Sequence, residues 1–402
     1  MRILFVTPEW PYPPNQGGRI RMFNIIRQLA KGHELHLISV TLQPLKTSEH
    51  DALIPFCSSI RTVPQPSASW RIPIRVVKSV LMRKPFVVFK HLPKELAEVV
   101  QATVSQEQPD VVLVEFHYIS DCINGLDVHH VVDMHNLDTV LYNRFEHSPK
   151  WGMKKVHGRI QRSLMHAFEK QLPQRFDACV TVSDTDRDLL KTWSNTSNVY
   201  TVPNGVDVDY FTPGISFPQR FDLVFTGSMD YYPNIDAAVF LCHEVMPRLW
   251  VRRPQTTLAI VGRDPSSALK ALGNDPRITV TGTVADVRPY LAGSTAVVVP
   301  LRMGGGTRLK VLEAAAMAKA IVGTSVGLEG IDVIPGQHVL VSDNAEDFAQ
   351  AVLDLLTRPA SAESLGLAAC SLIREYYSWS ACVARLEEVL RSVILNDKGT
   401  QW

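Results

Sequence analysis

Cysteine is scarce in this sequence. Six cysteines are scattered over 402 residues, and no two of them form a CxxC pair. This spacing argues against a zinc knuckle or a redox motif, and a long chain with so few cysteines is unlike a disulfide-stabilised scaffold. We therefore expect reduced thiols in the core of a cytoplasmic protein.

Long apolar runs and an excess of one charge are also missing. No segment reaches about 18 uncharged apolar residues, so no membrane span is expected. The short run Met1–Thr7 lacks the length and the cleavage site of a signal peptide. Lys and Arg number 41 and Asp and Glu 40, a net charge of +1. Nucleic-acid-binding domains are usually strongly basic, so we expect no nucleic-acid partner.

Short apolar segments alternate with segments of helical periodicity. Ile3–Thr7 is typical of a buried strand, a helix is expected from about Arg19 to Lys31, and Glu34–Val40 is the next strand. Such a βαβ unit predicts a parallel, doubly wound sheet. Three further strands are expected at Asp110–Glu115, His130–Met134 and Ala178–Ser183.

A second α/β series follows a turn-rich linker, Pro203–Pro213. We predict two doubly wound, Rossmann-like domains, residues 1–202 and 203–376, facing a cleft at their strand carboxyl ends. Residues 377–402 form a separate C-terminal helical segment. The strands of the second series are expected at Leu223–Thr226, Thr257–Val261, Ile278–Thr281, Ala296–Pro300 and Ala320–Gly323.

The strongest chemical motif lies between a strand that ends at Pro300 and a helix that we expect to begin near Thr307. Glycines allow a phosphate to approach backbone N–H groups, and a helix N-terminus offers unpaired donors and a positive dipole. The motif therefore predicts a phosphate site. Its glycines are Gly304, Gly305 and Gly306.

Two cations, Arg308 and Lys310, fall in the expected first turn of this helix. Cations there oppose the helix dipole by roughly 0.3–1 kcal/mol each. Because this local rule is broken twice, we expect a bound anion such as a nucleoside diphosphate. Glu313 lies about one turn further and suits ribose hydroxyls. Neither a P-loop nor a GxGxxG motif after the first strand occurs, which disfavours a P-loop NTPase and a dinucleotide oxidoreductase.

With these residues the chain resembles the family-four retaining glycosyltransferases of the GT-B fold, and within them the sugar transferases of bacterial exopolysaccharide and capsule assembly. The resemblance covers nearly the whole chain in order. Five segments carry it: RILFVTPEWPYPPNQGG (2–18), VSDTDRDLL (182–190), VPNGVD (202–207), the glycine block 304–330 and YSWS (377–380).

The resemblance implies roles for individual residues. Loop glycines of the first domain would approach the donor diphosphate or sugar, a backbone segment of the second would hold the base, and Glu313 would bind ribose. The last helix would cross back onto the first domain. The donor-binding residues implied are Gly17, Gly18, Gly227, Ser228, Gly282, Thr283, Val284, Gly305, Gly306, Thr307 and Glu313.

Two departures from the family pattern alter these expectations. Gly305 stands where the family often has the first of two glutamates. Ser228 and Asn234 stand at about the places of an Arg and a Lys that often follow the first strand of the second domain. We infer that Arg308 and Lys310 supply the missing cations from the helix, with Arg263 as a weaker candidate.

The family is metal-independent, and no Asp-x-Asp at a strand end suggests a metal here. We expect no cofactor besides the nucleotide sugar itself. Leaving-group charge would be stabilised by Arg308 and Lys310. Glu115 and His117 alternate on a predicted strand and would share one face. His135 follows the next strand, and the sequence leaves open which of the three lines the acceptor site.

The segment 70–91 mixes six cations with many aliphatic residues. A basic amphipathic helix can lie on an anionic membrane. An ordinary helix whose apolar face packs on its own domain would show the same sequence pattern. This segment gives the expectation of peripheral contact with the inner membrane face.

The sequence thus predicts a retaining glycosyltransferase that moves a hexosyl group from a nucleoside-diphosphate sugar to a glycan or lipid-linked acceptor, in cell-surface polysaccharide biosynthesis. The alternative is a non-catalytic GT-B partner subunit of another transferase, which the acid missing at Gly305 favours. An epimerase or a phosphorylase of the same fold is a weaker reading, because carboxylates and a free-phosphate site are not evident.

Overall fold

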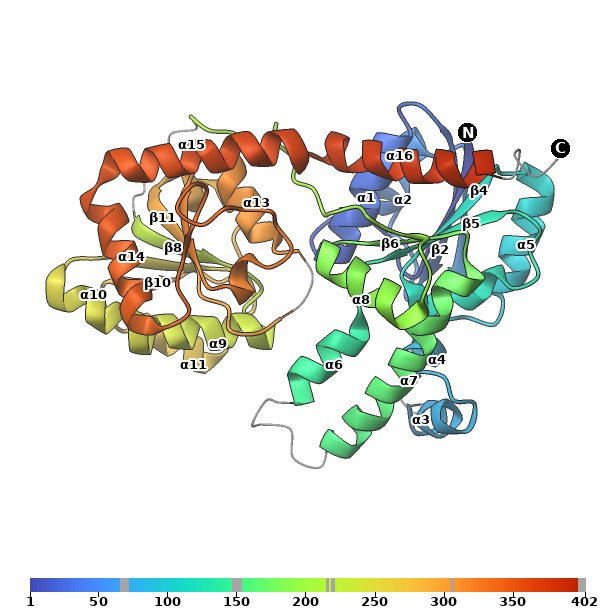
Figure 1. The fold of residues 1–402 in the computed structure, drawn as a ribbon, viewed down its shortest axis with the longest axis horizontal. Helices are drawn as coiled ribbons and strands as arrows, with labels where there is room; N and C mark the ends of the chain where they lie inside the picture. Colours follow the sequence, from blue (N-terminus) through green and yellow to red (C-terminus); the bar gives the residue numbers. More distant parts are fainter. Residues whose placement is uncertain (66–71, 147–153, 215–216, 218–220, 305–306, 397–402) are drawn as a thin grey trace. The chain divides into compact units, whose positions relative to one another are not determined.

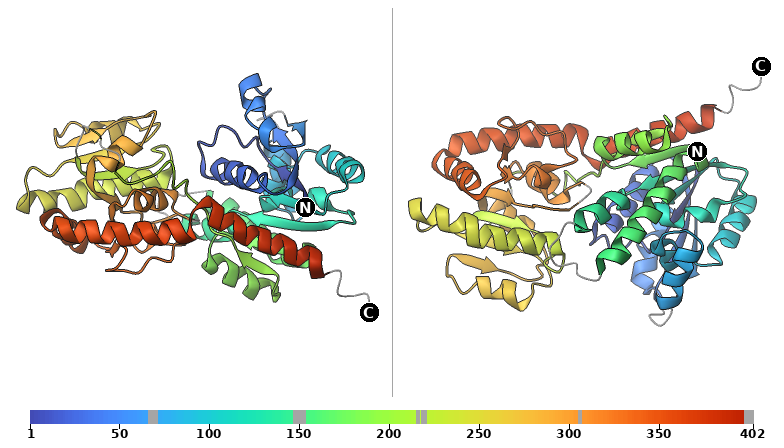
Figure 2. Two further views of the ribbon diagram at one scale, coloured as in Figure 1. Left: turned by 90° about the horizontal axis from the view of Figure 1, so that it is seen from above. Right: turned by 60° about the horizontal axis from the view of Figure 1, so that its bottom comes forward.

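The computed structural model describes residues 1–65, 72–146, 154–214, 217, 221–304 and 307–396. The chain divides into two compact units. The first comprises Met1–Pro203 and the residues from Cys382 onward, and the second comprises Asn204–Ala381. Both are α/β units whose sheets carry helices on each face (Figures 1 and 2).

In the described part of the first unit, seven strands form one parallel sheet in the order β3-β2-β1-β4-β5-β6-β7. The central strand β1 lies between β2 and β4, and its residues from Ile3 to Val6 are fully buried. A strand covered on both faces needs a continuous apolar run, which ILFV provides. The strands are β1 (Arg2–Thr7), β2 (Glu34–Thr41), β3 (Ser59–Pro64), β4 (Val111–Glu115), β5 (His129–Met134), β6 (Ala178–Thr181) and β7 (Val199–Thr201).

The helices of the first unit connect these strands, with short 3-10 turns between some of them. His117–Ile123 is one such turn and follows β4. The α-helices are α1 (Gly17–Leu29), α2 (Thr47–Asp51), α3 (Ile72–Leu81), α4 (Phe86–His91), α5 (Leu96–Glu107), α6 (Asp138–Glu146), α7 (Lys154–Arg175) and α8 (Asp184–Ser194).

The described part of the second unit contains a six-stranded parallel sheet in the order β10-β9-β8-β11-β12-β13. Its strands are β8 (Phe221–Thr226), β9 (Leu258–Val261), β10 (Ile278–Val280), β11 (Ser294–Val299), β12 (Ala320–Gly323) and β13 (Leu340–Val341). Its helices are α9 (Tyr232–Phe240), α10 (Met246–Arg252), α11 (Ser267–Leu272), α12 (Arg288–Ala292), α13 (Leu309–Ala316), α14 (Ala345–Thr357) and α15 (Pro359–Tyr376).

The last helix, α16 (Trp379–Asn396), begins in the second unit, and its residues from Cys382 onward group with the first. Within the first unit, Glu387 of α16 lies 3.3 Å from the ring of His33, which precedes β2. Among the described residues, no helix is both long and apolar enough to cross a membrane. All six cysteines are described, all are free thiols, and five are buried.

The structure corrects three expectations about local structure. The described part of the segment 70–91, residues 72–91, does not form one helix, because the chain turns between α3 and α4, where Arg83 has a φ of 51° and Pro85 precedes α4. The glycine-block helix α13 begins at Leu309 rather than near Thr307. Strands β3, β7 and β13 were not anticipated, and all three lie at sheet edges.

Candidate functional site

In both units the strand order reverses beside the first strand, at β1/β4 and at β8/β11. Ligands of doubly wound sheets bind at such switch points, beyond the carboxyl ends of the strands. In the first unit Glu115 ends β4 and His135 follows β5. In the second unit Gly227 follows β8 and Arg263 follows β9. The sequence-predicted residues therefore gather where such a fold binds ligands.

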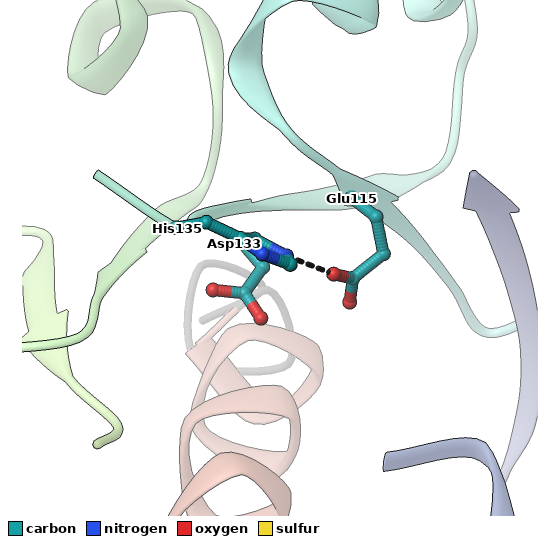
Figure 3. A group of neighbouring side chains, drawn as sticks. All are labelled: Glu115, Asp133 and His135. Atoms are coloured by element: carbon teal, nitrogen blue, oxygen red, sulfur yellow. Dashed lines mark hydrogen bonds and ion pairs between the residues drawn. The ribbon is translucent and has the colours of Figure 1, made fainter. Parts of the chain in front are cut away.

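Figure 3 shows His135 beside Glu115, with the ring nitrogen Nε2 2.6 Å from the carboxyl oxygen Oε2. The ring of Phe116 stacks on the imidazole, with centroids 3.6 Å apart. Gly18 packs against the same two side chains. A Cβ at this position would lie 2.8 Å from the Phe116 ring and 3.7 Å from Nδ1 of His135. Glycine at position 18 is therefore needed for the histidine and its stacking partner to fit.

A buried ion pair lies next to Glu115 and His135. Arg21 of α1 and Asp133 of β5 are both buried, and the guanidinium donates to the two carboxylate oxygens at 2.7 and 3.0 Å. It also donates to the backbone carbonyls of Val202 and Pro203 at 3.0 and 3.1 Å. Bidentate geometry and satisfied donors are the conditions under which a buried pair is tolerated.

The charges of this cluster balance without Glu115. Since Arg21 and Asp133 cancel, a second carboxylate would be a buried, uncompensated charge, and burial raises the pKa of Glu115 to about 8. Burial likewise lowers the pKa of His135 to about 3. At neutral pH a protonated Glu115 then donates to Nε2 of a neutral His135. This arrangement leaves the ring proton on Nδ1, which faces Gly18.

Donor atoms of Glu115, Asp133 and His135 lie within 4.8 Å of one another, as the ligands of a metal would. Arg21, however, contacts both carboxylate oxygens of Asp133. A metal would have to displace a guanidinium that already supplies the positive charge. The cluster therefore fits a neutral, hydrogen-bonded network better than a metal site.

The expectation that His117 shares a face with Glu115 is wrong. Phe116 has a φ of 63°, which turns the chain out of β4, and His117 opens the following 3-10 turn. Its buried ring lies 3.5 Å from Asp138 and 3.6 Å from Glu169. Glu169 also accepts the backbone N–H of Asp138 at 2.6 Å. His117 thus belongs to a second buried cluster, at the start of α6.

In the second unit, the loops after β8 and β9 approach each other very closely. A Cβ at Gly262 would overlap the carbonyl oxygen of Gly227, and a Cβ at Gly227 would lie 2.8 Å from the ammonium of Lys310. Glycine at both positions therefore allows the two loops to pack this closely and brings the Lys310 ammonium up to the backbone of Gly227.

Cations from elsewhere in the unit contact the two positions at which the family's Arg and Lys are missing. Lys310 Nζ donates to Asn234 Oδ1 at 2.8 Å and lies 4.5 Å from the centre of the Phe225 ring. Arg263 Nε donates to Ser228 Oγ at 2.7 Å. The structure thus brings Lys310 and Arg263 to Asn234 and Ser228 respectively.

Arg308 lies outside the helix, because its ψ of 87° is not helical and α13 begins one residue later. Only 7% of the residue is exposed. Its guanidinium lies 3.3 Å from the carbonyl of Val326 and 3.6 Å from Glu329. A Cβ at Gly304 would lie 3.1 Å from it, so Arg308 packs against the start of the glycine turn. Thr307 is partly exposed, and Gly305 and Gly306 lie outside the described residues.

Lys310 and Glu313 titrate unusually on one face of α13. Burial and the neighbouring Arg308 lower the pKa of Lys310 to about 7, and burial raises the pKa of Glu313 to about 7. Among the described residues, no carboxylate lies within ion-pair distance of the Lys310 ammonium, whose hydrogen-bond partner is the neutral Asn234. An anion placed there would restore the full positive charge of Lys310.

A cavity of about 580 Å³ opens at the carboxyl end of β10, where Gly282 has a φ of 70°. It is large enough for a nucleobase. Val284 is not among its lining residues and packs against the core of the unit. The lining residues are Asp264, Pro265, Lys270, Val280, Thr281, Gly282 and Thr283.

Comparison with known families assigns both units. Residues 16–210 match the family described as Glycosyltransferase Family 4, and residues 220–358 match the family described as Glycosyl transferases group 1. The chain belongs to the GT-B glycosyltransferases. The expected family and fold are therefore confirmed.

This glycosyltransferase is 19% identical, over 94% of its length and 96% of the relative's, to an uncharacterised 44.6 kDa protein in the cps region of Klebsiella pneumoniae. Its structure is similar to sucrose-phosphate synthase of Thermosynechococcus elongatus, with a TM-score of 0.73, 16% identity and 98% and 100% of the two chains covered. It is also similar to Anabaena HepE in complex with UDP, with a TM-score of 0.66, 13% identity and 98% and 100% covered.

Two residues that position the glycosyltransferase's buried cluster were not identified from the sequence. Arg21 occupies the apolar face of α1 with Ile25 and Leu29, and Asp133 interrupts the buried strand β5. A charge inside an apolar pattern usually has a buried partner. That signal could have marked both residues, although not their pairing across 112 positions.

Proposed function

We propose that this glycosyltransferase transfers a hexosyl group from a nucleoside-diphosphate sugar to a glycan or lipid-linked acceptor, with retention of the anomeric configuration. The proposal places the reaction in the synthesis of cell-surface polysaccharide. The location of the Klebsiella relative in a cps region supports this setting.

Lys310 carries the proposal. Its ammonium lies beside the backbone of Gly227 and has no carboxylate within ion-pair distance among the described residues. It donates to Asn234, whose amide in turn donates to the carbonyl of Ser228, the residue that Arg263 contacts. Leaving a cation in this state is unfavourable unless a ligand anion pairs with it. A diphosphate supplies several anionic oxygens, and the charge that develops on it during sugar transfer is what such cations stabilise. That Anabaena HepE was also solved with UDP-glucose supports a sugar diphosphate as this ligand.

We assign the remaining donor residues around this cation. The cavity at Gly282 and Thr283 would hold the base, and Glu313 the ribose. Arg308 would orient the glycine turn toward the diphosphate from its position against Gly304. Gly17 and Gly18 keep the donor role that the resemblance implies. No step in this assignment involves a metal or a further cofactor.

For the acceptor we assign the cluster of Glu115 and His135. Nδ1 of His135 carries a proton in the neutral cluster and points toward the Gly18 loop. It is therefore suited to hydrogen-bond a sugar or acceptor hydroxyl. Glu115, fully buried behind the ring, would hold this tautomer rather than touch the acceptor.

The test is turnover by the purified chain. Incubation with UDP-, GDP-, ADP- and TDP-sugars should release the nucleoside diphosphate from one donor class. Proton NMR of a transferred product should show the donor's anomeric configuration. Arg308→Ala and Glu313→Ala should abolish turnover while thermal unfolding stays cooperative.

Two results would contradict the proposal. An inverted product would refute retention. Tight donor binding without turnover, for every donor and acceptor offered, would favour the non-catalytic partner subunit, to which Gly305 in place of an acid already points.

A further inference from the structure

Phe116, which joins β4 to the following 3-10 turn, has an unfavourable backbone conformation. Its φ is 63° and its ψ is 126°. A positive φ brings the Cβ of a residue against its own backbone, so a bulky residue adopts it only as a genuine outlier. Strained backbone persists where its surroundings hold it, and it is concentrated at functional sites. The conformation of Phe116, at the carboxyl end of a central strand, therefore points to a functional role.

The neighbours of Phe116 on both sides hold its backbone in place. Glu115 is fully buried in the cluster with His135, and His117 is 1% exposed in the second cluster, at the start of α6. The Phe116 N–H also donates to the carbonyl of Asp133 at 2.9 Å, which extends the pairing of β4 with β5. A relaxed backbone at Phe116 would turn Glu115 or His117 out of its cluster.

The strained backbone brings the Phe116 ring against His135. The two ring centroids are 3.6 Å apart, and the ring planes differ by 23°. The same phenylalanine ring packs against Tyr118, with centroids 5.1 Å apart, so it is itself held by a neighbour. Phe116 remains only partly buried. Removal of its side chain from water therefore does not explain the conformation as well as contact with the histidine does.

This contact restricts the imidazole of His135 in a way that Glu115 cannot. The hydrogen bond from Glu115 fixes Nε2 (Figure 3), but it leaves the ring free to turn about the line between Nε2 and Oε2. The outer side-chain torsion of histidine is broad and does not prevent this rotation. A flat ring against the face of the imidazole blocks it, and Nδ1 then keeps its direction toward Gly18.

We propose that Phe116 is a positioning residue for sugar transfer: its strained backbone holds a flat ring against His135 and so fixes the direction of Nδ1. This inference rests on the proposed function, which assigns that nitrogen to a sugar or acceptor hydroxyl. Phe116 acts through His135 and does not have to touch the substrate. Misplacing a group that contacts the substrate can cost up to about 100-fold in rate. The loss should appear in kcat rather than in donor KM, because the cations assigned to the donor lie in the second unit.

Phe116→Leu tests the contact, since leucine keeps an apolar side chain but has no flat ring. With a donor that the wild type turns over, kcat should fall about tenfold, while donor KM stays within about twofold. Phe116→His restores a flat ring and should recover most of the lost kcat at pH 8, where an ordinary imidazole is neutral. Phe89→Leu is the matched control, because Phe89 is a partly buried phenylalanine of α4 in the same unit. It should leave kcat and KM unchanged.

Thermal unfolding of Phe116→Gly and Phe116→Ala tests the strain separately from the ring. Glycine normally makes a protein less stable than alanine does, because it has more freedom in the unfolded chain. At a φ of 63° this order should reverse, and the glycine variant should unfold at the higher temperature. Both variants lack the ring, so both should lose at least as much kcat as Phe116→Leu.

The proposal is overturned if Phe116→Leu keeps the wild-type kcat or loses no more than Phe89→Leu. It is also overturned if Phe116→His is as slow as Phe116→Leu, if donor KM rises as much as kcat falls, or if the glycine variant unfolds below the alanine variant.

A crystal structure of Phe116→Ala separates this failure from failure of the proposed function, since it requires no turnover. The imidazole of His135 should leave its wild-type orientation or occupy more than one. An unchanged imidazole would overturn the role of Phe116 even if the chain transfers sugar. If the wild type turns over no donor, the proposed function fails, and the orientation of His135 in these crystals still decides whether Phe116 holds it.

Discussion

Two cations, one in each unit, show how differently a protein can use a buried positive charge. Arg21 is 1% exposed, and its guanidinium is matched by both oxygens of Asp133 and by two backbone carbonyls. Lys310 is only half buried, and its partner is a neutral amide. The charge of Arg21 is matched within the chain, whereas Lys310 has only the more distant carboxylate of Glu313 acting on it, and we propose that a ligand supplies the rest of its counter-charge.

Whether a cation has a counter-charge within the chain distinguishes a structural role from a ligand-binding role better than the burial of its side chain does. A compensated pair such as Arg21–Asp133 should matter for folding, and the pKa of its Arg stays raised. An uncompensated cation should matter for ligand binding, and its pKa is lowered. The predictions below test this division, from the largest effect to the smallest.

Asp133→Asn should lower the free energy of unfolding of the first unit by about 3–5 kcal/mol, because Arg21 is then a buried charge without a counter-ion. Urea denaturation checks this. The double variant Arg21→Met/Asp133→Leu should recover part of the loss, although the carbonyls of Val202 and Pro203 lose a donor. A single variant as stable as the wild type would show that the pair is not structural.

Sequence periodicity predicts the central strands well, because β1 and β8 are covered on both faces and need unbroken apolar runs. It misses β7 and β13, which are three and two residues long. Strands this short show no periodic pattern, and they are defined by backbone pairing with the neighbouring strand. It also misplaces His117, since nothing in the letters EFH indicates the positive φ of Phe116.

Contacts between distant residues are beyond sequence reasoning for a different reason. The glycine block indicates a phosphate site from composition alone. That Lys310 meets Asn234, 76 positions away, and Arg263 meets Ser228, 35 positions away, depends on how β8, β9 and α13 pack. The types of residue at the candidate site were therefore predictable, and their pairing was not.

Lys310→Ala should weaken nucleotide-sugar binding by about 2 kcal/mol, roughly 30-fold, as expected for a lost hydrogen bond between charged groups. Isothermal titration calorimetry measures it. Lys319→Ala is the matched control, since Lys319 is a partly buried lysine of the same unit that donates to the carbonyl of Ala292. If both variants lose affinity equally, the effect is general and Lys310 has no special role.

Binding should also depend on pH through Lys310. Its pKa of about 7 means that the cation is lost as the pH rises above 7, and a diphosphate restores it by raising that pKa. Affinity for a nucleotide sugar, whose diphosphate does not titrate near neutrality, should therefore fall above pH 7, by up to about 1.4 kcal/mol per pH unit. Lys310→Arg should remove the part of this slope that Lys310 causes, because arginine stays charged, while Glu313, whose pKa is also about 7, still titrates. A flat profile in the wild type would refute the assignment.

In the first unit the test is the protonation of Glu115. If the cluster is neutral, Glu115→Gln keeps a donor to Nε2 of His135 and should change kcat little. Glu115→Leu removes that donor and should lower kcat by about tenfold, near 1.4 kcal/mol, with little change in donor KM. A loss in Glu115→Gln as large as in Glu115→Leu would show that the ionised carboxylate is required.

The central claim is that a sugar diphosphate completes the charge of Lys310, and a crystal structure with UDP tests it most directly. The account predicts diphosphate oxygens within hydrogen-bond distance of Lys310 Nζ, beside the backbone of Gly227 and the first turn of α13. A diphosphate bound elsewhere, with Lys310 still hydrogen-bonded only to Asn234, would contradict it.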